Sequence, residues 1–191
     1  MTRPRLVLGS ASPRRAEILR QIGLPPDDIR PPEIDETPGK GELPTAYVMR
    51  MALEKIAVLE PRVGEVVLCA DTTVAVGRRI LGKPEGEDEA RAFLDLLGGR
   101  RHQVHTAVTV RDADGVKSRL VTSMVKFKRL SETEIAGYLA SDDWKGKAGG
   151  YAIQGYAGSF IKNMTGSYSN VVGLSLYDTM QMLKSAGFFK S

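Results

Sequence analysis

Cysteine and histidine are scarce in this sequence. The chain contains one cysteine, Cys69, and only two histidines, His102 and His105. A single cysteine excludes an internal disulfide, and its place in an apolar run favours a buried thiol over a reactive one. The two histidines stand three residues apart in a predicted strand, so they point to opposite faces of a sheet. We therefore do not expect them to share a metal ion.

Long apolar runs and aromatic-rich basic stretches are also missing. No segment approaches the length of a membrane span, and the three apolar residues after Arg5 are too few for a signal peptide. We therefore expect a cytoplasmic protein with no membrane partner. The net charge is +4 and aromatic residues make up only 6% of the chain. The charge suits an anionic ligand, but the lack of a basic, aromatic-rich strip argues against a nucleic-acid partner.

The first predicted helix begins with an unusual charge. Residues 6–8 predict a buried strand, and a serine followed by a proline then predicts a helix start. Helix starts favour acidic residues, yet Arg14 and Arg15 stand there, each at a cost of about 0.3–1 kcal/mol. Together with the hydroxyl of Ser10, they form a pattern that favours phosphate binding. Two solvated arginines on an ordinary helix are the alternative.

Acidic and basic residues recur in the next segments. The proline-rich loop 25–44 holds Glu33, Asp35 and Glu36, which repel one another unless they are solvated or share a divalent cation. Spacing alone favours a solvated acidic loop. The predicted helix 45–59 places Lys55 beside its apolar stripe, where an exposed lysine is the simplest interpretation.

The strongest signal for a buried strand covers residues 66–70, followed by Asp71 and Thr72. Ligands of open α/β sheets bind beyond the carboxyl ends of strands, so Asp71 is expected to face a crevice. An aspartate that caps a turn fits its position equally well. Lys83 lies between a glycine and a proline that restrict its backbone, although a plain β-turn has the same pattern.

The remaining pattern predicts a mixed architecture. It indicates a helix over 87–97, hairpin strands over 103–110 and 116–127, a capped helix over 131–139, a strand over 159–162 and a last helix over 176–184. Gln154, interpreted as buried, could read the edge of a base or satisfy backbone groups. We predict a three-layer α/β protein with an elongated mixed β-sheet and two lobes around a central cleft. No linker divides residues 1–191 into separate domains.

Taken together, these pieces resemble the Maf family of nucleoside triphosphate pyrophosphatases. The resemblance covers residues 6–183 and rests on motifs in a specific order. They are SASPRRAEIL (10–19), EIDET (33–37), ALEKIA (52–57), ADTTV (70–74), GKP (82–84), the strand 102–106, AGGYAIQG (148–155) and GSYSNVVGL (166–174). Each motif is weak alone, whereas the ordered set is highly specific.

Family membership implies an activity and a set of residue roles. The enzyme would hydrolyse the α–β bond of a nucleoside triphosphate with a divalent cation, magnesium or manganese, on a fold similar to the inosine triphosphatases. The residues expected to hold phosphates are Ser10, Arg15, Lys55 and Lys83. Glu36 and Asp71 would handle metal and water, with Asp71 as the proton acceptor.

The resemblance also implies a substrate class. Members resembling dTTP/UTP pyrophosphatases carry Arg, Thr and Gln at the places of Arg14, Thr72 and Gln154. The branch that acts on 7-methyl-GTP typically carries a bulky aromatic, Gln and Glu there. We therefore expect dTTP and UTP as substrates, with a pyrimidine pocket near Gln154.

Two other interpretations stay open at this point. A nucleotide-binding regulator with little turnover is one, because the family name refers to septum formation in cell division. The intact set of Glu36, Lys55, Asp71 and Lys83 argues against it, since a pure binder need not keep a water-activating acid. A 7-methyl-GTP pyrophosphatase is the other. Family members are often dimers, so a homodimer is compatible with the resemblance.

Overall fold

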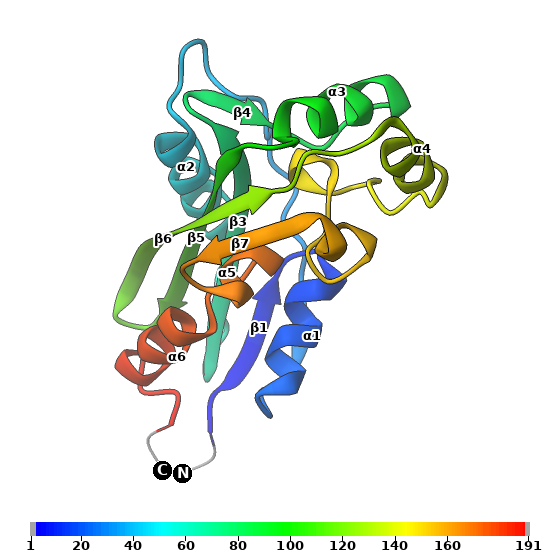
Figure 1. Ribbon diagram of the computed structural model, residues 1–191. Helices are drawn as coiled ribbons and strands as arrows, with labels where there is room; N and C mark the ends of the chain where they lie inside the picture. The colour runs from blue at the N-terminus through cyan, green and yellow to red at the C-terminus, as the bar shows by residue number, and fades with distance from the viewer. Residues whose placement is uncertain (1–2, 190–191) are drawn as a thin grey trace.

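The computed structural model describes residues 3–189, and one mixed β-sheet of seven strands runs through it (Figure 1). The strands are β1 (Arg5–Gly9), β2 (Asp28–Ile29), β3 (Glu65–Val76), β4 (Arg79–Leu81), β5 (Arg101–Asp112), β6 (Gly115–Phe127) and β7 (Ile161–Thr165). Their order is β2-β1-β3-β5-β6-β7, with β4 paired to β3. β1 runs parallel to β2 and β3, and the other pairs are antiparallel.

Helices cover both faces of this sheet, which gives the predicted three layers. They are α1 (Pro13–Gln21), α2 (Pro44–Ala57), α3 (Glu87–Leu97), α4 (Glu132–Ala140), α5 (Tyr168–Val172) and α6 (Leu176–Ser185), with 3-10 helices η1 (Ala148–Gly150) and η2 (Tyr156–Phe160). On β3, Val66 and Leu68 pack with α1 and α6, whereas Val67 and Cys69 pack with Ile56 of α2. β3 is thus buried on both faces, which explains its continuous apolar run. No helix within residues 3–189 is long and apolar enough to cross a membrane.

Two apolar cores lie along the α1 face of the sheet, and a polar seam separates them. On β3, Ala70 belongs to the core with α1 and α6, and Val74 belongs to the core with α3 and α4. Between them stands Thr72, paired with Thr106 of β5, with 2.9 Å between the two hydroxyl oxygens. The cores correspond to the two predicted lobes, and Figure 1 shows α3 and α4 together at one end of the sheet.

The sheet is open on one side of β3, between the ends of β1 and β4. β1 pairs with β3 as far as Cys69, and β4 begins to pair at Val74. Within the described residues, positions 70–73 therefore keep only β5 as a neighbouring strand. Asp71 points toward α2 and Thr72 toward α1, and the opening lets side chains from both faces of the strand reach one space.

Two strand predictions were wrong in extent. β3 continues through Asp71 to Val76 because β5 pairs with it residue by residue from Val67 to Ala75. Residues 156–160 form η2, and the next strand starts only at Ile161, where pairing with β6 begins. The predicted helix 87–97 and the capping box at Ser131 are confirmed.

His102 is a titratable side chain inside the second core, with 1% of its surface exposed. Its Nε2 lies 2.7 Å from the hydroxyl oxygen of Tyr151, and the rings of Tyr151 and Phe127 contact it edge-on. Burial lowers the pKa of His102 to about 4, because the charged form is poorly solvated there. His105 faces the other side of the sheet and contacts Thr122, which confirms the predicted separation of the histidines.

We predict that His102 makes the protein less stable as the pH falls from 6.5 toward 4. In this pH range His102 binds a proton in the unfolded chain but stays neutral in the folded one. The free energy of unfolding therefore drops by about 3 kcal/mol. In urea titrations of His102→Gln across this range, the pH slope should be flatter than in the wild type. Parallel curves for the two proteins would contradict the prediction, whatever the difference in their absolute stabilities.

Candidate active site

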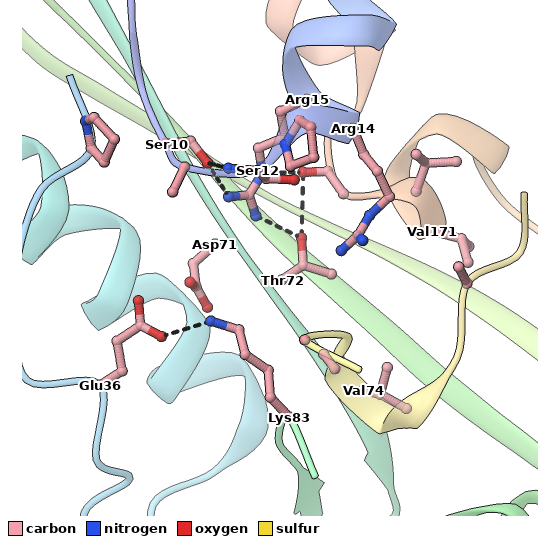
Figure 2. Close-up of a pocket in the computed structure, with 18 of the residues that line it drawn as sticks. Ser10, Ser12, Arg14, Arg15, Glu36, Asp71, Thr72, Val74, Lys83 and Val171 are labelled. Carbon is pink, nitrogen blue, oxygen red and sulfur yellow. Dashed lines mark hydrogen bonds and ion pairs between the residues drawn. The ribbon is translucent and has the colours of Figure 1, made fainter. Parts of the chain in front are cut away.

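A cavity of about 360 Å³ opens at the gap beside β3 (Figure 2). Its walls come from the β1–α1 turn, the loop before α2, the middle of β3, the turn after β4, the segment around η1, and α5. Every residue predicted for the site lines this one cavity: Ser10, Arg14, Arg15, Glu36, Lys55, Asp71, Thr72, Lys83 and Gln154. The fold thus gathers side chains from well-separated parts of the chain.

The start of α1 forms a cationic wall. Its first turn contains no acidic residue, and Ser12 is the N-cap without a capping bond from its side chain. The backbone N–H of Ser12 instead donates to Oγ of Ser10 at 3.2 Å. Arg14 is half-buried and points into the cavity in Figure 2. Within residues 3–189 its guanidinium forms no hydrogen bond or ion pair, so its donors are available to an anionic ligand.

Arg15 is buried in the polar seam, with 8% of its surface exposed. Its Nε donates to the carbonyl of Gly173 at 2.8 Å, Nη1 to Oγ of Ser10 at 2.8 Å, and Nη2 to Oγ1 of Thr72 at 3.2 Å. Burial lowers the pKa of Arg15, and the charge of Asp71 opposes that effect. Each nitrogen of the guanidinium head has an internal partner, so Arg15 contacts a phosphate only by sharing or exchanging these bonds.

Two carboxylates and two lysines form the opposite side of the cavity. Nζ of Lys55 lies 2.5 Å from Oδ1 of Asp71 and 2.7 Å from Oε1 of Glu36. Nζ of Lys83 lies 3.4 Å from Oε2 of Glu36. The side chains of Lys55 and Asp71 are 10% and 11% exposed, whereas that of Lys83 is 62% exposed. The inner pair is therefore held in place, and the outer lysine is free to move toward a ligand.

The charge state of Glu36 follows from these contacts. Burial raises the pKa of Glu36, but the hydrogen bond and charge of Lys55, together with Lys83, hold the pKa below its usual value. Glu36 therefore stays ionised at neutral pH and presents a negative charge to the two ammonium groups.

The loop that carries Glu36 has no helix or strand of its own between β2 and α2, and α2 anchors it. The hydroxyl of Tyr47 donates to the carbonyl of Glu36 at 2.8 Å. Arg50 donates to both carboxylate oxygens of Glu42 at 2.8 Å and to the carbonyl of Thr37 at 3.1 Å. Such fork-like bonds fix direction as well as distance, which explains how a long loop holds Glu36 at one place.

Glu36 and Asp71 fit a divalent cation as a pair. Within residues 3–189 no group of three or more His, Cys, Asp or Glu side chains is placed to hold a metal ion. Glu33 is exposed and Asp35 accepts the N–H of Thr37, and neither lines the cavity. Two carboxylates nevertheless suit Mg²⁺ or a similar hard cation, which usually takes its other ligands from water and substrate phosphates. Their oxygens already converge on one cation, the ammonium of Lys55.

The prediction that Gln154 is buried was wrong. Gln154 is exposed at the edge of the cavity, in the turn between η1 and η2. The apolar residues around it suggested burial, but Tyr151 alone of this segment packs fully into the second core. Exposure leaves both the donor and the acceptor of the Gln154 amide available to a ligand.

The sequence did not identify Gly173 as part of the site. Its carbonyl accepts the hydrogen bond from Arg15, and its φ of 129° is one that glycine favours. The motif 166–174 contains this glycine, but a backbone carbonyl gives no side-chain signal. Tyr151, Val171 and Val172 also line the cavity and supply its apolar wall.

Sequence similarity to a protein family and to named relatives extends over nearly the whole chain. Residues 5–186 match the family described as Maf-like protein. The chain is 58% identical over 182 residues to a protein named dTTP/UTP pyrophosphatase from Roseobacter denitrificans, covering 95% of this chain and 97% of the relative. It is also 58% identical to a protein of the same name from Cereibacter sphaeroides, covering 95% of each. A solved nucleoside-triphosphatase / dITP/XTP pyrophosphatase from Mycobacterium abscessus aligns with 96% of this chain and 95% of its own, at 13% identity and a TM-score of 0.44.

We predict that the two neighbouring arginines respond differently to replacement by lysine. Arg15→Lys leaves some of its three acceptors without a donor, so the free energy of unfolding should fall by about 1–3 kcal/mol. Arg14→Lys, the matched control, loses no internal bond and should change it by less than about 0.5 kcal/mol. Chemical denaturation of both variants measures this contrast. Equal losses would show that the bonds of Arg15 do not stabilise the fold.

Proposed function

Because this chain belongs to the Maf-like protein family, we propose that it is a nucleoside triphosphate pyrophosphatase that hydrolyses dTTP and UTP. The products are the nucleoside monophosphate and pyrophosphate. The observation that carries the proposal is the lining of the cavity beside β3. It brings Arg14, Lys55 and Lys83 to the same space as the carboxylates of Glu36 and Asp71.

The cations account for the binding of the triphosphate. Among the described residues, the donors of Arg14 are free, and a 3.4 Å contact to Glu36 is the one ion pair of the exposed Lys83 ammonium. The hydroxyl of Ser10 and the backbone N–H of Arg14 add neutral donors at the helix start, whereas Pro13 has no N–H and the N–H of Arg15 is bonded to the carbonyl of Ser12. Hydrolysis of a phosphoanhydride depends mainly on positioning and on neutralising the oxygens of the transferred group, and this wall supplies both.

Asp71 accounts for activation of water. A water molecule attacks the α-phosphorus, its proton passes to the carboxylate of Asp71, and the bond from the α-phosphorus to the bridging oxygen breaks, with pyrophosphate leaving. β5 holds the backbone of Asp71 in register, and Lys55 holds its side chain. Both constraints favour a base that stays aimed at one point, which is what general-base catalysis requires.

A divalent cation, magnesium or manganese, belongs to this proposal. Glu36 and Asp71 would hold it, since their oxygens converge and no other carboxylate in the described part of the chain lines the cavity. When bound, the ion supplies positive charge to the phosphate oxygens. Lys55 then keeps its carboxylate contacts or turns toward a phosphate.

The nucleoside side of the cavity suits a pyrimidine. Gln154 offers one amide donor and one acceptor at the edge, a pairing that matches the carbonyl and N–H of thymine or uracil. Tyr151, Val171 and Val172 provide apolar surface beside it. Arg14 and Thr72 complete the trio of residues that implied dTTP and UTP.

We predict fast pyrophosphate release from dTTP and UTP in a panel that also contains CTP, 7-methyl-GTP and ITP, with manganese present. Asp71→Asn should lower kcat about 10²- to 10⁴-fold, because it removes the proton acceptor while keeping the shape of the side chain. Asp95→Asn, the same change at an exposed position of α3, should leave activity unaltered.

Other results of this panel would redirect the proposal. Turnover of 7-methyl-GTP in place of dTTP would overturn the interpretation of Arg14, Thr72 and Gln154. Binding without turnover of any nucleotide would favour the nucleotide-binding regulator. Full activity in Asp71→Asn would remove Asp71 from the chemistry.

We predict that Gln154→Glu lowers kcat/KM for dTTP and UTP by roughly 10-fold or more, because the change removes a donor and adds a charge beside the base. Exposure of Gln154 means that the melting temperature should stay near that of the wild type. Gln21→Glu, the same substitution on the exposed end of α1, is the control. Unchanged pyrimidine turnover in Gln154→Glu would rule out this contact.

A further inference from the structure

The segment that carries Gln154 depends on its two ends for its position. Residues 152–155 belong to no helix or strand. At the first end, Tyr151 contacts His102 inside the core. At the second end, the backbone N–H of Tyr156 donates to Oδ2 of Asp143 at 3.2 Å. Asp143 does not line the cavity. It lies in the turn after α4 and therefore contacts the segment from outside the cavity.

Asp143 and Gly155 are in unusually close contact. A Cβ atom placed on Gly155 would lie 2.1 Å from Oδ2 of Asp143, well inside van der Waals contact. The φ of Gly155 is −103°, an extended conformation open to other residues, so backbone freedom does not explain the glycine. The close approach of the Asp143 carboxylate explains why a residue without a Cβ atom stands here. The carboxylate is also held from its other oxygen, because its Oδ1 is paired with Nζ of Lys147 at 3.2 Å.

We propose that Asp143 is a positioning residue for base selection: it clamps Gly155 and Tyr156 and thereby sets where the amide of Gln154 stands. This inference rests on the proposed function, since it assigns a role in choosing pyrimidines. Asp143 does not line the cavity, so its role is one of positioning and not of direct contact with a ligand there. It acts on Gln154 through the next two residues of the chain.

The charge of Asp143 also acts on Arg14. Burial lowers the pKa of Arg14, and the negative charge of Asp143 works in the opposite direction. Arg14 forms no ion pair within the described residues, so the negative charge of Asp143 helps to stabilise the positive charge of its guanidinium. Asp143 therefore influences two of the three residues that implied dTTP and UTP, Arg14 and Gln154.

The test compares Asp143→Ala with the wild type on dTTP, UTP and CTP. A misplaced Gln154 should raise KM for dTTP and UTP about fivefold to tenfold, the value of one hydrogen bond, while kcat changes by less than about twofold. KM for CTP reports any effect that Asp143 exerts through Arg14, which every nucleotide shares. KM for dTTP and UTP should rise about fivefold to tenfold beyond that common change, so the preference for dTTP over CTP falls by this factor. Asp143→Asn keeps an oxygen for the Tyr156 N–H and should recover part of the loss.

Asp142→Asn is the matched control. Asp142 is adjacent, but it is exposed and pairs with Lys145, so its replacement should leave every KM unchanged. Gly155→Ala provides independent evidence, because its methyl group displaces the Asp143 carboxylate and should reproduce the raised KM. The double variant Asp143→Ala/Gly155→Ala should be no worse than Asp143→Ala, since the carboxylate that the methyl group would strike is gone.

The outcomes separate this inference from the proposed function. Wild-type turnover of nucleotides tests the function, and the ratio of dTTP to CTP affinity tests the role of Asp143. Calorimetric dissociation constants for dTTP and CTP, measured without metal, give that ratio even if turnover is absent. An equal loss for all nucleotides, additive effects in the double variant, or an unchanged ratio in Asp143→Ala would overturn the proposal.

Discussion

The buried guanidinium of Arg15 joins the parts of this molecule that must meet for a cleft to exist. It bonds to the β1–α1 turn through Ser10, to β3 through Thr72, and to the α5–α6 turn through Gly173. These elements flank the polar seam between the two apolar cores. A buried charge is costly unless it is well hydrogen-bonded, so the acceptors and the arginine stabilise one another only when all are in place. The seam is therefore a specific structure and not merely a gap in the packing.

The topology of the sheet decides where a ligand enters. Along one edge of β3, β1 stops pairing at Cys69 and β4 starts pairing at Val74, so within the described residues no strand covers that edge in between. Asp71 and Thr72 are neighbours in sequence and point in opposite directions, yet both line the cavity. A fully paired β3 would have separated them by a layer of sheet. The opening is what allows the carboxylates and lysines on the α2 side of the sheet and the arginines of α1 to face the same space.

Opposite charges are already paired in the cavity. Lys55 contacts Asp71 and Glu36, and Lys83 contacts Glu36. A buried charge with a partner has a smaller free-energy cost than an isolated one. An anionic ligand replaces these partners, so its binding does not require hydrated ions to be desolvated first. Arg14, without an ion pair in the described residues, is the cation most available for a first contact. In the proposed activity the inner pair, Lys55 and Asp71, is held in place, whereas the outer cations, Lys83 and Arg14, are available to bind the substrate.

Local patterns were enough to locate most elements, and the ordered motifs named nine residues that line one cavity. The capping box at Ser131 and the helix 87–97 are set by neighbours within a few positions, and the ordered motifs identified the family. The sequence by itself thus pointed to these nine side chains, but not to Gly173 or to the apolar wall of the cavity. Only the tertiary structure decided how they are held: that β3 runs on through Asp71, that Gln154 is exposed, and that Arg15 is bonded to a carbonyl 158 residues away. Those features depend on strand pairing, on close approach between distant segments and on backbone acceptors, and none of these leaves a pattern within a short stretch of sequence.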